Sequence, residues 1–235
     1  MLVIPGQLGR FFNNKVKNTL GYEAMGINFR GPSHEEALYP ADSLAWRAYR
    51  NPLTTFIGGV SAVYMQLSDP QVRSGVWAHS SFKRNAKRRI QRTGLSSMMT
   101  VYGPKSQAKK MIEGVNRMHE RVRGVTDDGI EYDATDPKLL NWVFNTSKLG
   151  IYSAYDRFGP GVGQESLSEA YGVAADSAAH LFGATGPARS VEEMDAFLLL
   201  RLDNLEGHPI LDEFSAIIKN TSLMPMGMSS IQRLL

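Results

Sequence analysis

The chain has 235 residues, of which 43% are hydrophobic and 21% are charged, so it can bury a substantial core as one large domain. It has no cysteine, which excludes disulfides, thiolate nucleophiles, iron–sulfur clusters and thiolate zinc sites. The net charge of +3 does not by itself indicate nucleic-acid binding. Because no run of about 18 apolar residues occurs, we expect no membrane span and, by default, a cytoplasmic protein.

The first 40 residues are expected to form an N-terminal arm with at most a short helix, because residues 26–40 are rich in Gly, Pro and polar residues. From Ser43 onward the pattern becomes helical. Asp42 or Ser43 can cap the first helix, since a side-chain oxygen can accept a hydrogen bond from a free amide of the first turn.

Residues 54–67 predict an apolar helix that contains small residues, among them Gly58 and Gly59. Small residues permit the close approach of a neighbouring helix or of a flat ligand, and the sequence leaves both open. Asp69-Pro70 predicts the start of the next helix, because the missing N–H of proline is harmless in a first turn.

Six cations lie within ten residues of the basic segment 83–92. A solvated helix face is the simplest interpretation, and a nucleic-acid patch is an alternative that no recognised motif or interleaved aromatic residue supports. Arg89, Arg92 and Thr93 share one helical face that leads into an apolar segment, so they differ from the other basic residues. A half-buried arginine needs an anionic partner, which can be a protein carboxylate or a ligand.

Residues 105–123 predict an amphipathic helix, with Gly124 as its C-cap and Arg121 and Arg123 near its negative end. His119 lies on the apolar stripe of this helix. A histidine in that position is either a core residue with satisfied ring nitrogens or a ligand that faces a cavity.

The chain has five histidines, and no two of them have the i,i+3 or i,i+4 spacing of a helical metal site. His79 lies between Trp77 and Phe82 and is interpreted as a packing or helix-end residue. No P-loop, strand–glycine–helix unit or Gly-x-Ser-x-Gly motif is present, so nucleotide-binding and hydrolase signatures are absent.

The second half of the chain also predicts helices separated by Pro and Gly breaks. They begin at Asp136-Pro137, at about Leu167, at Ser190 with its capping-box acid Glu193, and at Pro209. We therefore expect an all-α fold of about eight to ten short helices. The expected division is an arm at 1–40, one helical domain at 41–222 and a flexible tail at 223–235.

The order and spacing of short motifs along most of the chain carry a resemblance. The motifs are Ser43-Leu44-Ala45-Trp46-Arg47, Asn51-Pro52, Gly58-Gly59, Asp69-Pro70-Gln71-Val72, His79-Ser80-Ser81-Phe82, Arg89-Ile90-Gln91-Arg92-Thr93, His119-Glu120-Arg121 and Asp136-Pro137-Lys138-Leu139-Leu140-Asn141-Trp142-Val143. From about residue 40 to 200 the chain resembles bacterial oxygenase-like domains related to latex-clearing rubber oxygenase and the fungal mpaB-type oxygenases. The resemblance implies a globin-like, all-helical b-type haem protein that cleaves carbon–carbon double bonds of isoprenoid chains with dioxygen.

The resemblance also assigns roles to residues. His119 resembles the proximal iron ligand, and Arg89, Arg92 and Thr93 resemble the catalytic residues of the distal side. Arg89 and Arg123 are further candidates for cofactor binding. The implied partners are a hydrophobic small molecule and dioxygen, to which Arg92 and Thr93 would donate hydrogen bonds that stabilise developing negative charge.

This chain departs from the family pattern at three positions. Arg92 stands where rubber oxygenase has lysine, and arginine cannot easily lose its proton to act as a base. Phe144 and Ser68 stand where relatives usually have histidine. These departures keep an alternative open, a cofactor-free binding or scaffold protein in which the two arginines of the distal side pair with Glu113 or Asp136.

Overall fold

The computed structural model describes residues 35–79 and 82–221. Within them the chain forms nine α-helices and one two-stranded antiparallel sheet, so the predicted all-α class is confirmed. The elements are α2 (Leu44–Tyr49), α3 (Pro52–Ser68), α4 (Pro70–His79), α5 (Phe82–Tyr102), α6 (Lys105–His119), β1 (Arg123–Val125), β2 (Glu131–Asp133), α7 (Pro137–Phe158), α8 (Gly163–Ala174), α9 (Val191–Leu199) and α10 (Pro209–Asn220).

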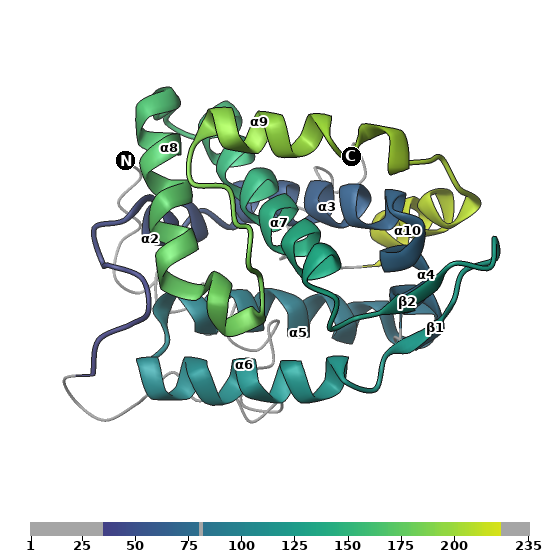
Figure 1. Cartoon of the computed structure of the whole chain (residues 1–235). Helices are drawn as coiled ribbons and strands as arrows, with labels where there is room; N and C mark the ends of the chain where they lie inside the picture. The colour runs from purple at the N-terminus through teal and green to yellow at the C-terminus, as the bar shows by residue number, and fades with distance from the viewer. Residues whose placement is uncertain (1–34, 80–81, 222–235) are drawn as a thin grey trace.

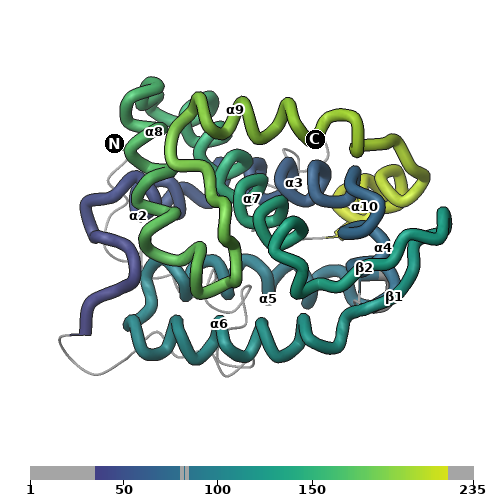
Figure 2. Tube along the Cα trace, in the orientation of Figure 1, coloured from purple at the N-terminus to yellow at the C-terminus, as the bar shows by residue number. Residues whose placement is uncertain are grey.

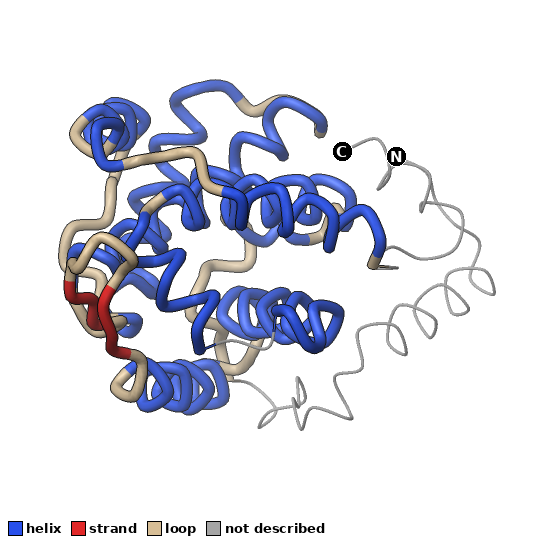
Figure 3. Tube along the Cα trace, turned by 90° about the vertical axis from the view of Figure 1, so that its right-hand side faces the viewer, coloured by secondary structure: helices blue, strands red, loops and turns tan. Residues whose placement is uncertain are grey.

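The helices form layers around a central pair, α3 and α7 (Figure 1). Helices α5 and α6 lie side by side along the lower edge of Figure 1, α9 lies along the upper edge, and α8 descends from the upper left. Figure 2 follows the chain from the end of α6 through the hairpin and back into α7. The hairpin therefore joins the α5–α6 layer to the central pair, and it lies at one edge of the molecule (Figure 3).

The central pair packs so closely that only glycine fits at the contact. A Cβ atom on Gly58 would lie 2.4 Å from the carbonyl oxygen of Gly150, and one on Gly150 would lie 2.3 Å from that of Gly58. A Cβ atom on Gly59, one residue away, would meet no neighbouring group within 4 Å. Gly58 therefore serves helix packing, the first of the two alternatives that the sequence left open.

Most helix starts are fixed locally, as predicted. The side chains of Asn51 and Asp69 each accept bonds from two amides, of α3 and α4, and the side chain of Asp136 accepts one from the first turn of α7. Ser190 accepts a bond from the amide of Glu193, which caps α9. Ser43 precedes α2 without making a side-chain cap bond, so the cap predicted there is wrong.

One predicted helix end is wrong. The helix that begins at Lys105 ends at His119, and Gly124 pairs with Tyr132 in the hairpin instead of capping a helix. The physical reason is the pairing of the two hairpin strands, which brings Tyr132 so close that a Cβ on Gly124 would lie 2.6 Å from its hydroxyl. Residues 83–102 belong to one helix with non-helical backbone angles at Asn85, and α8 continues through a π-turn into a 3₁₀ turn that ends at Phe182.

Some expectations fall on residues that the structure does not describe. Most of the predicted arm at 1–40, namely residues 1–34, and the predicted tail at 223–235 lie outside the described residues. Among the helices of the described part, none combines the length and the apolar character needed to cross a bilayer.

Candidate functional site

The facing sides of α5 and α6 bring together the residues that the sequence singled out. We call this group, Arg89, Arg92 and Thr93 on α5 with His119 on α6, the α5–α6 seam. The Arg92 guanidinium approaches the sulfur of Met118 at 4.0 Å, and the charge of Arg89 is close enough to His119 to act on its pKa. Residues about 30 positions apart in the chain thus lie near each other, an arrangement that spacing within one helix could not predict.

Arg89 is the most constrained side chain of the seam. Its Nη1 donates a hydrogen bond of 2.5 Å to the Thr93 hydroxyl, and its guanidinium lies 5.6 Å from the centre of the Phe82 ring. The Thr93 hydroxyl in turn donates to the Arg89 carbonyl oxygen at 3.0 Å. The hydroxyl proton of Thr93 is therefore already committed, and the threonine holds Arg89 in position.

Burial and like charge act on the ionisable groups of the seam. Burial, and then the charge of Arg92, lowers the pKa of Arg89. Burial, and then the charge of Arg89, lowers the pKa of His119 from its usual value of 6.5. His119 is therefore neutral at pH 7, which is the protonation state in which imidazole binds metal ions.

One nitrogen of His119 has no partner. Nδ1 is buried and makes no hydrogen bond to any residue that the structure describes. Buried polar atoms usually have a partner, and the Tyr152 hydroxyl and Nε1 of Trp142 are further buried atoms that lack one among the described residues. The described residues therefore do not form the alternative in which both ring nitrogens of a core histidine are hydrogen bonded.

The two arginines of the seam also lack acidic partners in the described part of the chain. The ion pairs found there join other residues, and none includes Arg89 or Arg92. Glu113 is exposed, and Asp136 accepts the amide of Lys138 at the start of α7. The pairs expected for a cofactor-free protein are therefore not formed among these residues, and the two cations can face an anionic group.

Arg123 lies outside the seam. Its Nε is 2.8 Å from a carboxylate oxygen of Asp133 across the hairpin, and its side chain is 65% exposed. Hydrogen bonds from Thr135, and then the charge of Arg123, lower the pKa of Asp133. The part of Arg123 in cofactor binding stays a prediction, because this pair would have to open first.

His79 is a helix-end residue, as interpreted from the sequence. It is the last residue of α4, and its Nε2 is hydrogen bonded to the Tyr132 hydroxyl at 3.2 Å. This bond ties the end of α4 to the hairpin, so the ring of His79 has a structural partner that His119 lacks.

The positions where relatives have histidine are filled by local packing. Phe144 is buried in the main core, and the Ser68 hydroxyl donates to the Tyr64 carbonyl oxygen. The ammonium of Lys148 lies 5.3 Å from the ring centres of both Phe144 and Tyr39. Burial lowers the pKa of Lys148 to about 8. Sequence reasoning missed this lysine, although a cation in the apolar helix one turn after Phe144 was a signal.

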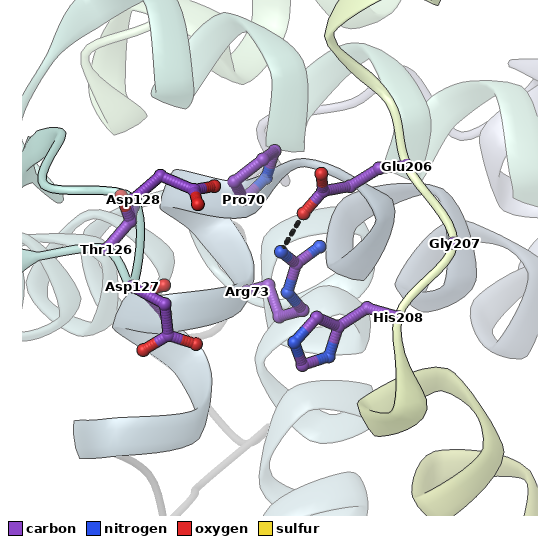
Figure 4. A pocket seen from close by; sticks show the side chains of 9 residues that line it. Pro70, Arg73, Thr126, Asp127, Asp128, Glu206, Gly207 and His208 are labelled. Atoms are coloured by element: carbon purple, nitrogen blue, oxygen red, sulfur yellow. Dashed lines mark hydrogen bonds and ion pairs between the residues drawn. The ribbon is translucent and has the colours of Figure 1, made fainter.

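A second feature that the sequence did not predict is a polar pocket of about 230 Å³ between α4, the hairpin turn and the α9–α10 loop (Figure 4). Its deepest side chain, Arg73, pairs with Glu206 and donates to the Leu67 carbonyl oxygen. Asp127, Asp128 and His208 lie around them, and Nδ1 of His208 accepts the amide of Ile210. No residue of the α5–α6 seam lines this pocket.

The described residues offer no cluster of three or more His, Asp and Glu side chains for a metal ion. A metal held by several protein ligands is therefore not built from this part of the chain. A metal carried by a bound organic group needs as few as one protein ligand, so a site of that kind would not contain such a cluster.

Comparison with known proteins gives one match. The family model described as ER-bound oxygenase mpaB/B'/Rubber oxygenase, catalytic domain, matches residues 46–234, which is most of the chain. No curated protein and no solved structure matches the chain.

Proposed function

The chain belongs to the family of oxygenase catalytic domains of ER-bound mpaB and rubber oxygenase, and from this membership we propose that it is a haem-dependent oxygenase acting on a hydrophobic small molecule. The observation that carries the proposal is the buried, unpartnered ring nitrogen of His119 opposite the Arg89 face of α5. The family supplies the reaction class, and the seam supplies the residues that would bind the cofactor.

The residues of the seam fit a b-type haem. His119 is held neutral by burial and by Arg89, so it has a lone pair to give to iron. The haem carboxylates would offset the repulsion between Arg89 and Arg92, which have no acidic partner in the described residues. When bound, the haem supplies an iron centre that activates dioxygen.

The two arginines and Thr93 then have different tasks. Arg92 is exposed and keeps its protons, so it can donate hydrogen bonds to an oxygen atom but cannot serve as a base. Thr93 donates its proton to the Arg89 carbonyl oxygen and accepts from the Arg89 guanidinium. We therefore assign Thr93 the positioning of Arg89, where the sequence suggested a direct bond to dioxygen.

An absorption spectrum tests the proposal. We expect the purified protein, reconstituted with haem, to show a Soret band that His119→Ala removes or shifts. His180→Ala is the matched control, because His180 is an exposed histidine outside the seam and should leave the band unchanged. Absence of a Soret band in the wild-type protein, or an identical band in His119→Ala, would contradict the proposal.

The alternative is a cofactor-free helical binding protein. What favours it is Phe144, which occupies its position in the core together with Lys148 and leaves no room for a histidine that supports the proximal side. Iron ligation by His119 then depends on the seam alone. The same spectrum decides between the two functions.

A further inference from the structure

The charge of this protein is strongly divided along the chain. Residues 82–123 contain 12 of the 26 Lys and Arg residues but only two of the 23 Asp and Glu residues. Residues 163–220 contain ten acidic residues and three Lys or Arg residues. The net charge of the whole chain is only +3, but residues 82–123 form a basic region with a net charge of +10 and residues 163–220 an acidic region with a net charge of −7.

The fold separates most of these charges. Most of the basic region forms the α5–α6 layer at the lower edge of Figure 1, and the acidic region includes α9 at the upper edge, although its turn at 180–182 packs on α6. Several basic side chains of the layer are exposed, and we call them the basic face: Lys87, Arg88, Arg92, Lys109, Lys110 and Arg117. Within the described residues, no ion pair joins a carboxylate to any of them.

We propose that the basic face binds a membrane surface rich in anionic lipid. Each Lys or Arg that comes near such a surface strengthens binding by about fivefold, so several cations on one face are enough for peripheral attachment. The acidic edge is repelled by the same surface, which orients the molecule with α5 and α6 toward the lipid. The cytoplasmic leaflet carries this negative charge, in agreement with the cytoplasmic location expected from the sequence.

The basic face lies beside the α5–α6 seam, so membrane attachment would bring the seam close to the lipid. Arg92 belongs to both, and Met118, which it contacts, is 47% exposed. The seam therefore reaches the surface on the side that would lie against the lipid. If the proposed function holds, a hydrophobic substrate dissolved in the bilayer would meet the protein at this side.

Lipid fits this face better than nucleic acid. The aromatic side chains of α5, Phe82 and Tyr102, are not exposed, so the stacking that single-stranded nucleic acids require is not offered. The exposed large hydrophobic residue of the layer, Met118, has an apolar side chain that suits a lipid surface.

Co-sedimentation of the full chain with vesicles tests the proposal. We expect binding to phosphatidylcholine vesicles that contain about 30% phosphatidylglycerol, weak binding to phosphatidylcholine alone, and release in about 0.5 M salt. The variant Lys109→Glu/Lys110→Glu/Arg117→Glu should bind at least about 100-fold more weakly. The control Arg157→Glu/Arg189→Glu/Lys219→Glu has the same net charge but changes exposed residues outside α5 and α6, so it should retain binding within a few-fold.

Several results would overturn the proposal: equal binding to neutral and anionic vesicles, no binding to either, equal losses in the two triple variants, or tighter binding of a short RNA or duplex DNA at the same salt concentration. Vesicle binding needs no haem, and the three residues of the test variant are outside the proposed haem site. Failure of the vesicle assay therefore leaves the Soret test of the proposed function intact, and the reverse also holds.

Discussion

The α3–α7 interface and the α5–α6 seam are opposite solutions to helix packing. In the first, two backbones touch at Gly58 and Gly150, and side chains such as Gln66 bridge to the neighbouring helix with their hydrogen bonds made. In the second, two arginines repel each other and a buried histidine nitrogen lacks a partner among the described residues. The α3–α7 interface therefore stabilises the fold, whereas the α5–α6 seam has unsatisfied polar groups that a ligand could bind.

The largest expected effect lies in the interface. Gly150→Ala would place a methyl group 2.3 Å from the Gly58 carbonyl oxygen, which forces the two helices apart. We expect a loss of about 3 kcal/mol or more in the free energy of unfolding, measured with urea.

Gly59→Ala is the matched control, because the new methyl group would meet no neighbouring group within 4 Å. Alanine has the higher helix propensity, so this variant should gain up to about 1 kcal/mol. Equal stability of the two variants would mean that the backbones of α3 and α7 do not touch at these glycines.

These two glycines also show how far sequence reasoning reached. Pro, Asn and Asp near helix starts act through their own neighbours, so the starts of α3, α4 and α7 were predictable. The meeting of Gly58 with Gly150, which is 92 positions away, depends on tertiary packing. The role of Gly124 was missed because it is set by strand pairing with Tyr132, which the helical pattern of residues 105–123 did not indicate.

The candidate site divides in the same way. The helical face of Arg89, Arg92 and Thr93 was predicted from spacing within one helix, and its position opposite His119 followed from the resemblance. The pocket around Arg73 and the contact of Lys148 with Tyr39 join residues from separate elements, so local patterns could not predict them.

The next largest effect is a gain in stability, because the buried charge of Lys148 on α7 is unfavourable. Lys148 on α7 is buried, and burial lowers its pKa to about 8. We expect Lys148→Met to raise the free energy of unfolding at pH 7 by about 1–3 kcal/mol, since the loss of the cation–π contacts offsets part of the gain.

The pH dependence of that gain provides the control. The pKa of Lys148 is lower in the folded chain than in the unfolded one, so protonation favours unfolding. The stability of the wild-type protein should rise between about pH 8 and the pKa of an unfolded lysine, about 10.4, and the advantage of Lys148→Met should shrink over this range. A constant advantage from pH 7 to 10 would show that the gain comes from packing and not from the charge.

A smaller pH effect is expected from the seam. The pKa of His119 is lowered by burial and by Arg89, so its protonation also favours unfolding. The apo-protein should therefore lose stability as the pH falls from 7 through 6.5 to the folded pKa, and His119→Gln should flatten this loss. In an NMR titration, Arg89→Gln should raise the pKa of His119, and an unchanged value would place the two side chains too far apart to interact.

The smallest effect on stability is expected at Thr93, which separates positioning from direct catalysis. Thr93→Val removes the hydroxyl that accepts from the Arg89 guanidinium, but the residue is exposed, so the free energy of unfolding should change by less than about 1 kcal/mol. If Thr93 positions Arg89, the valine variant should bind haem several-fold more weakly, and Thr93→Ser, which keeps the hydroxyl, should restore the affinity. If haem affinity is unchanged in Thr93→Val and only the reaction with dioxygen slows, then the threonine donates to oxygen and its bond to the Arg89 carbonyl must break during the reaction. The two variants together decide between two partners for the Thr93 hydroxyl. It either keeps its bond to the Arg89 carbonyl oxygen, so that the protein alone arranges the seam as it does the α3–α7 interface, or it turns to dioxygen when dioxygen binds.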